Sequence, residues 1–177
     1  PRAGYVSPSV FVPYLEELGL IRQVSQWVLN HACKQRAAWQ QSGFMRDGSI
    51  AVNLSSRQII HTDVVDMVQD AADRHLVEPA WIALEVTEQS LITDTDRAMQ
   101  NLSALRDRGF RIALDDFGTG YSSLSHLRLL PFDTIKIDRS FISDLHQEDN
   151  KSIVSSVIGL AHSLRAQVIA EGIENGR

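Results

Sequence analysis

The sequence predicts an α/β fold in which helices cover a parallel sheet. Short apolar runs rich in β-branched residues alternate with segments of helical periodicity, which is the pattern of βαβ units. The predicted strands are apolar almost throughout, as expected of strands covered on both faces. Five such units form either an open doubly wound sheet or part of a (β/α)8 barrel, which usually takes about 250 residues. No GxGxxG motif follows the first strand to favour a dinucleotide-binding sheet.

The first helix is predicted from apolar residues at helical spacing, Ile21, Val24, Val28 and Ala32, with Trp39 on the same face. The β-rich run at 49–55 is the first predicted strand. Thr62 is the expected N-cap of a second helix, because a threonine hydroxyl accepts a hydrogen bond from a free backbone N–H. The apolar positions of that helix are Val64, Val65, Val68 and Ala72. The second strand is predicted at 81–88.

The second half of the chain continues this alternation. Asp94 is the expected N-cap of a third helix, which Gly109 ends in the position that glycine favours. Strands are predicted at 110–117, 134–138 and 167–173. The apolar positions of the connecting segments are Ala98, Leu102 and Leu105, then the short amphipathic stretch 124–130, then Ile153, Val157, Leu160, Ala161 and Leu164.

The composition excludes several classes of protein. The 177 residues, 44% hydrophobic and 22% charged, fit one globular domain. A net charge of -5 argues against a DNA or RNA polymer as the partner, and no apolar run approaches the roughly 20 residues of a membrane helix. The single cysteine, Cys33, excludes an internal disulfide and is expected in the core. We therefore expect a cytoplasmic domain, whose parent protein can be membrane-attached through other domains.

Polar residues gather at the carboxyl ends of the predicted strands, which is the edge where α/β folds bind ligands. The residues concerned are Asn53, Glu85, Glu88, Asp115, Asp116 and Glu171, together with Lys136 and Asp138 of the fourth strand. Such oxygen-rich clusters suit hard cations such as Mg2+ or Mn2+. A carboxylate that bridges two ions about 4 Å apart would build a two-metal hydrolytic site. Each residue taken alone also fits a salt bridge or a turn, and it is the repetition over the strands that favours a site.

Two details of this pattern make structural predictions. Asp115 and Asp116 are adjacent and cannot both point the same way in an extended strand. The strand is therefore expected to end or turn there, and the following Gly-Thr-Gly permits the turn. Lys136 lies between Ile135 and Ile137 and faces the opposite way from both. We expect it to point into the barrel, where it can pair with acids or hold a water molecule.

These residues lie in motifs that resemble the EAL domain family. The motifs are NLS (53–55), EVTE (85–88), DDFGTGYSSL (115–124), KIDRSFI (136–142) and AEGIE (170–174), in this order and spacing, after the opening GYVSPSVFVPYLEELGLI (4–21). The resemblance covers essentially the whole chain. It implies a modified (β/α)8 barrel that hydrolyses cyclic di-GMP to linear pGpG in bacterial signalling, with two Mg2+ or Mn2+ ions.

The resemblance also implies roles for individual residues. Asn53, Glu85 and Asp115 correspond to ligands of one metal ion, and Asp115 bridges to a second ion that Asp116 and Glu171 help to hold. Lys136 corresponds to the residue that orients the attacking water. With Lys136, Glu88 and Glu171 form the expected catalytic group, in which Glu88 anchors the loop that shapes the site. The expected substrate and loop residues are Asp138, Gly118, Thr119 and Gly120.

By the same resemblance, residues 1–177 are the central portion of a single EAL domain. The Glu-Ala-Leu strand would lie upstream of Pro1 and the final strands beyond Arg177, so we expect the isolated fragment to be inactive. In the intact domain we expect a homodimer and an upstream sensory or GGDEF domain. The main alternative is a degenerate EAL receptor that binds cyclic di-GMP without cleaving it. A regulatory interaction domain that uses the barrel only as a scaffold is a further alternative.

Overall fold

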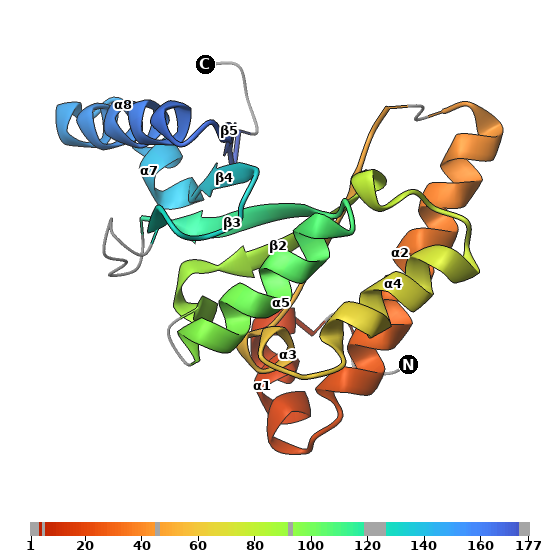
Figure 1. The fold of residues 1–177 in the computed structure, drawn as a ribbon. Helices are drawn as coiled ribbons and strands as arrows, with labels where there is room; N and C mark the ends of the chain where they lie inside the picture. The colour runs from red at the N-terminus through yellow and green to blue at the C-terminus, as the bar shows by residue number, and fades with distance from the viewer. Residues whose placement is uncertain (1–3, 5, 45–46, 92–93, 119–126, 174–177) are drawn as a thin grey trace.

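A computed structural model describes residues 4, 6–44, 47–91, 94–118 and 127–173. Its five parallel strands have the order β1-β2-β3-β4-β5, so each strand pairs with the next one along the chain (Figure 1). The strands are β1 (Ile50–Asn53), β2 (Ile82–Thr87), β3 (Arg111–Phe117), β4 (Thr134–Ile137) and β5 (Gln167–Ala170). A doubly wound sheet reverses its strand order at a switch point, whereas a barrel does not. The unbroken order confirms the α/β prediction and favours the barrel over the doubly wound sheet.

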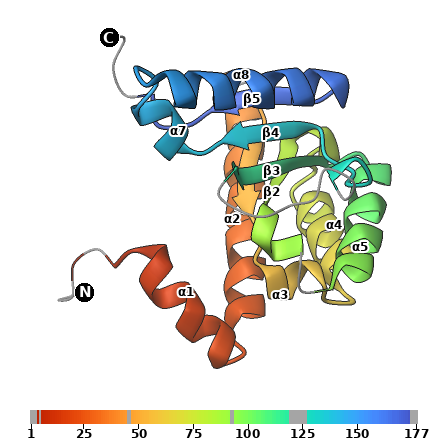
Figure 2. The same cartoon turned by 90° about the vertical axis from the view of Figure 1, so that its left-hand side faces the viewer.

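Helices connect the strands and cover one side of the sheet. They are α1 (Pro8–Glu17), α2 (Ile21–Ser42), α3 (Ser56–Ile59), α4 (Val64–Arg74), α5 (Thr95–Asp107), α7 (Arg139–Ser143) and α8 (Glu148–Ser163), with 3-10 turns η1 (Pro79–Trp81) and η2 (Glu88–Leu91). Helix α2 packs on β1 and α4, α5 packs on β3, and α8 packs on β4 and β5. Helix α1 stands apart from the strands beside the start of α2 (Figure 2). Among the described residues, no helix combines the length and hydropathy needed to cross a membrane.

Side chains alternate across the sheet, which separates the core from the site. On the helix-covered face the core includes Val52, Leu84, Ile112, Leu114 and Ile135, all buried. Because successive residues of a strand point to opposite faces, their neighbours lie on the other face. That face carries small residues first and polar residues toward the carboxyl ends of the strands: Ala51, Ala83, Ala113 and Thr134, then Asn53, Glu85, Asp115 and Lys136. The sheet therefore presents its polar side chains at one edge of one face.

The helix α2 exists as predicted, but its buried face is not the predicted one. Its buried residues are Ser25, Leu29, Cys33 and Arg36, whereas Val28 of the predicted row is 36% exposed. Ala32 of the predicted row does pack against the core, but the buried row lies one residue further along the helix and includes an arginine. The guanidinium of Arg36 lies 4.0 Å from the ring centroid of Trp81, and its Nε donates to the carbonyl of Gly48 at 2.7 Å. Apolar periodicity does not detect a buried cation held in this way. The expectation that Cys33 lies in the core is confirmed.

The helix-start predictions had mixed outcomes. Thr62 was the wrong N-cap, because α4 begins at Val64 and Asp63 takes the cap position. The carboxylate of Asp63 makes no cap bond and instead contacts Arg22 and His61. The prediction for α5 is confirmed, since Asp94 Oδ1 accepts a hydrogen bond from the backbone N of Arg97 at 3.2 Å.

The helix ends and faces of the second half are mostly as expected. Ala98, Leu102 and Leu105 are buried, and Gly109 has the left-handed φ of +92° that favours glycine after a helix. In α8, Val157 and Ala161 are buried, but Ile153 is 40% exposed, and its neighbour Val154 packs against the core instead. The amphipathic stretch predicted at 124–130 falls partly outside the described residues.

Candidate active site

Lys136 lies at the centre of a cluster of acidic side chains. Because Ile135 and Ile137 point into the core, Lys136 points to the other face, as predicted. Its Nζ donates hydrogen bonds at 2.8 Å to Glu85 Oε1, at 2.9 Å to Asp115 Oδ1 and at 2.6 Å to Glu171 Oε1. Strands β2, β3 and β4 and the end of β5 thus each contribute one side chain to a single ionic group.

The surroundings of Lys136 keep it protonated. Its side chain is only 11% exposed, and burial by itself lowers a lysine pKa. The hydrogen bonds from Lys136 to Glu171, Glu85 and Asp115 outweigh that effect, so the pKa of Lys136 is raised above its ordinary value. One positive charge faces three carboxylates, which leaves the group with an excess of negative charge.

Asp115 and Asp116 reach the same space because β3 is irregular at its end. The pairing of β3 with β4 shifts register between Leu114 and Phe117, and Asp116 has a left-handed φ of +52°. The backbone N of Asp116 donates to Asp115 Oδ1 at 3.0 Å. The expected change of direction is present: it begins at Asp116 within the strand and continues at Gly118, whose φ is +99°. Aspartate tolerates this conformation better than most residues do.

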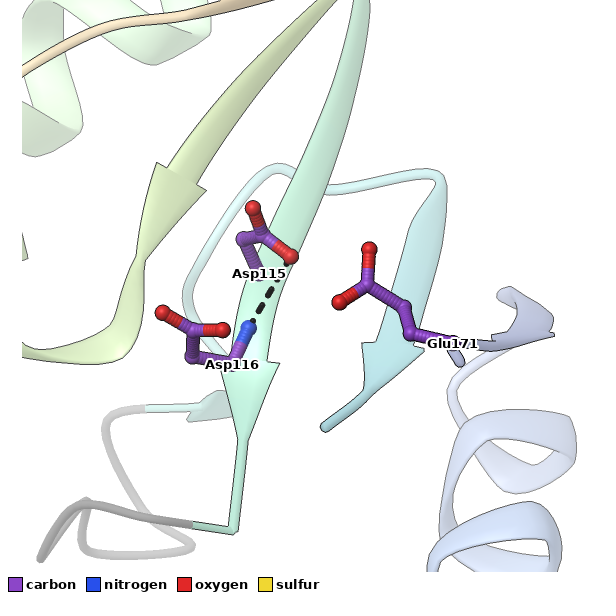
Figure 3. Close-up of side chains that lie close together, drawn as sticks. All are labelled: Asp115, Asp116 and Glu171. Carbon is purple, nitrogen blue, oxygen red and sulfur yellow. Dashed lines mark hydrogen bonds between the residues drawn. The ribbon is translucent and has the colours of Figure 1, made fainter. Parts of the chain in front are cut away.

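The two aspartates and Glu171 form an oxygen-only cluster. One carboxylate oxygen from each of Asp115, Asp116 and Glu171 lies within 4.8 Å of the others, and Figure 3 shows the three side chains facing a common space. The pKa of Asp116 is raised by burial and by the negative charges of Asp115, Asp138 and Glu171, against which Lys136 acts. Carboxylates that converge in this way repel one another until a proton or a cation neutralises them. The donor set fits a hard divalent cation.

Asn53 and Glu85 extend this edge toward β1. They are paired directly across β1 and β2 in the parallel register, so both lie on the same face at the carboxyl end. Glu85 joins the acidic cluster through Lys136. The assignment of Asn53 as a metal ligand stays a prediction.

Glu88 directly follows β2 and contacts the first residue of the loop that follows β3. It is the first residue of η2 and only 3% exposed, and its Oε2 accepts a hydrogen bond from the backbone N of Gly118 at 3.4 Å. This contact agrees with the expectation that Glu88 anchors the loop. Thr119 and Gly120 lie outside the described residues.

Asp138 has a structural function that the sequence patterns did not predict. The fourth strand ends at Ile137 rather than at Asp138, and Asp138 is the N-cap of α7. Its Oδ1 accepts hydrogen bonds from the hydroxyl and from the backbone N of Ser140, and these lower the pKa of Asp138. The motif Asp-Arg-Ser contained the signal, since aspartate is a favoured N-cap residue.

The fold and the site together define a class of protein. A parallel, barrel-type sheet carries acids and a lysine at the carboxyl edge of its strands, which is where barrel enzymes place their catalytic groups. The chain belongs to the EAL domain family, which matches residues 1–177.

Relatives and solved structures of this family resemble the chain over almost its full length. It is 44% identical over 175 residues to the bifunctional diguanylate cyclase/cyclic di-GMP phosphodiesterase MucR of Pseudomonas aeruginosa, a match that covers 98% of this chain and 25% of MucR. The signaling protein YkoW of Bacillus subtilis is 38% identical over 169 residues, 95% of this chain and 21% of YkoW. The chain thus spans about a quarter of the length of these curated relatives.

Solved structures of the family have the same fold. The phosphodiesterase of MucR in complex with c-di-GMP superposes with a TM-score of 0.92 at 44% identity, covering 99% of this chain and 71% of that one. The EAL enzyme Bd1971 with bound cAMP and cyclic-di-GMP gives a TM-score of 0.91 at 35% identity, covering 99% of this chain and 49% of that one. The predicted membership of the EAL family is confirmed, and with it the TIM-like barrel class.

Proposed function

We propose that this chain forms the central portion of an EAL domain that hydrolyses cyclic di-GMP to linear pGpG with two Mg2+ or Mn2+ ions. The observation that carries the proposal is the ionic group around Lys136, which joins acids from three strand ends at the carboxyl edge of the sheet. The family relation to a cyclic di-GMP phosphodiesterase supports the choice of substrate.

The acidic residues divide into two groups that suit two ions. Asn53, Glu85 and Asp115 would hold one ion, because Asn53 and Glu85 are register partners and Glu85 and Asp115 share Lys136. Asp115, Asp116 and Glu171 would hold the second, because their oxygens already lie within 4.8 Å of one another. Asp115 belongs to both groups and is the proposed bridge. When bound, the ions would neutralise the charge of the phosphodiester and lower the pKa of a bound water molecule.

The remaining residues of the site orient the reactants. Lys136 stays charged, but its three N–H groups are engaged by Glu85, Asp115 and Glu171. One of these carboxylates would have to release its hydrogen bond before Lys136 donates to a water molecule or to a phosphate oxygen. Glu171 is the most accessible of its partners, with 31% of its side chain exposed, so it can both hold an ion and accept a hydrogen bond from the attacking water. Glu88 fixes the loop at Gly118. Asp138 and the loop residues Gly118, Thr119 and Gly120 would then shape the substrate side of the site.

The context of the domain forms part of the proposal. We infer a cytoplasmic domain that works as a homodimer, in a larger protein with a sensory or GGDEF domain upstream. The description of MucR as a bifunctional diguanylate cyclase and phosphodiesterase supports the inferred GGDEF domain. The proposed dimer rests on the resemblance to the EAL family, in which the loop of the DDFGTGYSSL motif (115–124) is tied to dimerisation. Glu88 accepts a hydrogen bond from Gly118 of this motif.

Hydrolysis by the full-length protein is the test. Purified protein is incubated with cyclic di-GMP and Mn2+, and the products are separated by chromatography. We expect pGpG from the wild type and from the control Asp70→Asn, which changes an exposed residue of α4. Asp115→Asn should lower the rate by at least about 100-fold because the bridging carboxylate is lost. A wild type that binds cyclic di-GMP without metal and forms no pGpG would contradict the proposal and favour the receptor.

A further inference from the structure

The short helix α7 lies against the backbone at two glycines that follow the acidic residues of the site. Gly118 comes two residues after Asp116, and Gly172 comes directly after Glu171. A Cβ atom placed on Gly118 would lie 2.9 Å from Cε2 of Phe141. A Cβ atom placed on Gly172 would lie 2.4 Å from Cγ of Arg139. Carbon atoms in ordinary contact are about 3.5–4.0 Å apart, so α7 touches both segments of chain directly.

The position of α7 explains why one helix reaches both segments. It begins directly after β4, which lies between β3 and β5 in the sheet. The chain leaving β3 passes Phe141, and the chain leaving β5 passes the aliphatic stem of Arg139. Both glycines have a left-handed φ, +99° at Gly118 and +76° at Gly172, so these two turns combine an unusual backbone conformation with a close neighbour.

The helix itself is held firmly enough to act as a support. Asp138 caps its first turn through Ser140, and the hydroxyl of Ser143 donates to the carbonyl of Arg139 at 2.9 Å. Phe141 packs against the hydrophobic core. The segment that contains Gly172 is also held, because the backbone N of Glu171 donates to the carbonyl of Ile137 at 3.1 Å. This bond fixes the backbone of Glu171 close to the start of α7.

We propose that Arg139 and Phe141 are positioning residues that hold the two halves of the acidic cluster at the distance that a divalent ion requires. Phe141 supports the chain that carries Asp115 and Asp116, and the stem of Arg139 supports the chain that carries Glu171. The inference rests on the proposed function in that it treats the cluster as a metal site. It adds two residues that are proposed to act through the backbone that carries the metal ligands, not as ligands themselves.

Mn2+ binding by the full-length protein, measured by calorimetry, tests this inference separately from hydrolysis. Phe141→Leu keeps an apolar side chain but removes the ring from Gly118, and Arg139→Ala removes the stem from Gly172. We expect each to weaken Mn2+ binding by about 10-fold, within the range typical of residues that orient metal ligands. Arg139→Met keeps an unbranched stem and should stay within about twofold of the wild type. The control Arg97→Ala changes an exposed arginine of α5 and should bind normally.

The outcomes separate this inference from the proposed function. A wild type that binds no Mn2+ contradicts the metal site itself. A wild type that binds Mn2+, with Phe141→Leu and Arg139→Ala binding equally well, overturns the positioning function while leaving the metal site standing. If Arg139→Met loses as much affinity as Arg139→Ala, the guanidinium charge is what matters and the stem assignment is wrong.

A double substitution tests the contact at Gly172 directly. Gly172→Ala places a methyl group against Cγ and Cδ of Arg139, at 2.4 and 2.9 Å, and should weaken Mn2+ binding by more than about 10-fold. Adding Arg139→Ala removes both atoms, so the double variant should bind better than Gly172→Ala alone. Recovery will be partial because alanine remains strained at a φ of +76°. Losses that simply add would show that the two residues do not interact.

Discussion

The Nζ atom of Lys136 donates a 2.6 Å hydrogen bond to Oε1 of Glu171, although helices α7 and α8 separate the two residues in the chain. Glu171 follows β5, and its backbone N is bonded to the carbonyl of Ile137, the neighbour of Lys136. Backbone and side-chain bonds thus act together to keep the lysine and the glutamate in one place. The site is therefore built into the sheet, and its one lysine offsets only part of the negative charge around it.

Removing the charge of Lys136 should affect both stability and catalysis. Lys136→Met leaves Glu85, Asp115 and Glu171 without their shared cation, and we expect the free energy of unfolding to fall by about 1–3 kcal/mol. The rate of cyclic di-GMP hydrolysis should fall by at least about 100-fold, because a positioned proton donor is lost. Thermal unfolding and product formation measure the two effects. Mn2+ should restore part of the stability by supplying another cation.

The matched control for this prediction is Lys151→Met. Lys151 is exposed and, among the residues that the structure describes, pairs with Glu148 one helical turn away on α8. Such surface pairs contribute under about 1 kcal/mol. Equal losses in the two variants would show that the cluster around Lys136 has no special importance.

Neutralising Asp116 should have opposite effects with and without metal. The pKa of Asp116 is raised by burial and by Asp115, Asp138 and Glu171, so its charge is unfavourable where it stands. Asp116→Asn relieves that repulsion, and the melting temperature without metal should stay equal to the wild type or rise. The increase in melting temperature on adding Mn2+ should shrink, because a carboxylate ligand is lost. A variant with the full Mn2+ response would remove Asp116 from the metal ligands.

The loop contact of Glu88 should matter more for turnover than for substrate binding. Glu88→Ala removes the acceptor for the backbone N of Gly118, which frees the chain just after Asp115 and Asp116. A small displacement of catalytic groups costs about 10- to 100-fold in rate, so we expect kcat to fall within that range. KM should change much less. The exposed residue Glu78 supplies the control, since Glu78→Ala should leave kcat unchanged.

Strand periodicity was sufficient to predict the centre of the site. Successive side chains of a strand point to opposite faces, so a lysine between two core-facing apolar residues points to the other face. Lys136 does so and meets the acids of the neighbouring strands there. In β2 the burial alternates, so Glu85 lies on that face between the buried Leu84 and Val86. Burial does not alternate in β3, and there the bond to Lys136 locates Asp115. Parallel strands bring their carboxyl ends to one edge, so residues far apart in the sequence meet there.

Other features depended on contacts that periodicity does not contain. The buried row of α2 includes Arg36, whose burial is possible only because Trp81 and a backbone carbonyl receive its guanidinium. The left-handed conformation of Asp116 arises from the register shift between β3 and β4. Helix α7 is one turn long and has no repeating pattern. For that reason the contact of Phe141 with Gly118 appears only in three dimensions.

The stability of the domain should depend on pH through Asp63. Hydrogen bonding from Arg22, and to a lesser extent from His61, holds the pKa of Asp63 below its ordinary value of 3.8. A carboxylate with a lowered folded-state pKa adds stability that is complete above the unfolded-state pKa and disappears as the pH falls through the folded-state pKa. The loss therefore begins near pH 4 and continues below it. Because Arg22 and Asp63 are partly exposed, we expect a contribution under about 1 kcal/mol.

Chemical unfolding of the wild type and of Asp63→Asn at pH 7 and at progressively lower pH measures this contribution. The wild type should be the more stable protein at pH 7, and the difference should shrink as the pH falls below about 4, because protonation makes Asp63 resemble the amide. Asp70→Asn is the control, since Asp70 is exposed on the same helix. It should change stability little at any pH. A difference between wild type and Asp63→Asn that stays constant down to the acid transition would mean that Arg22 recognises the shape of the side chain at Asp63 and not its charge.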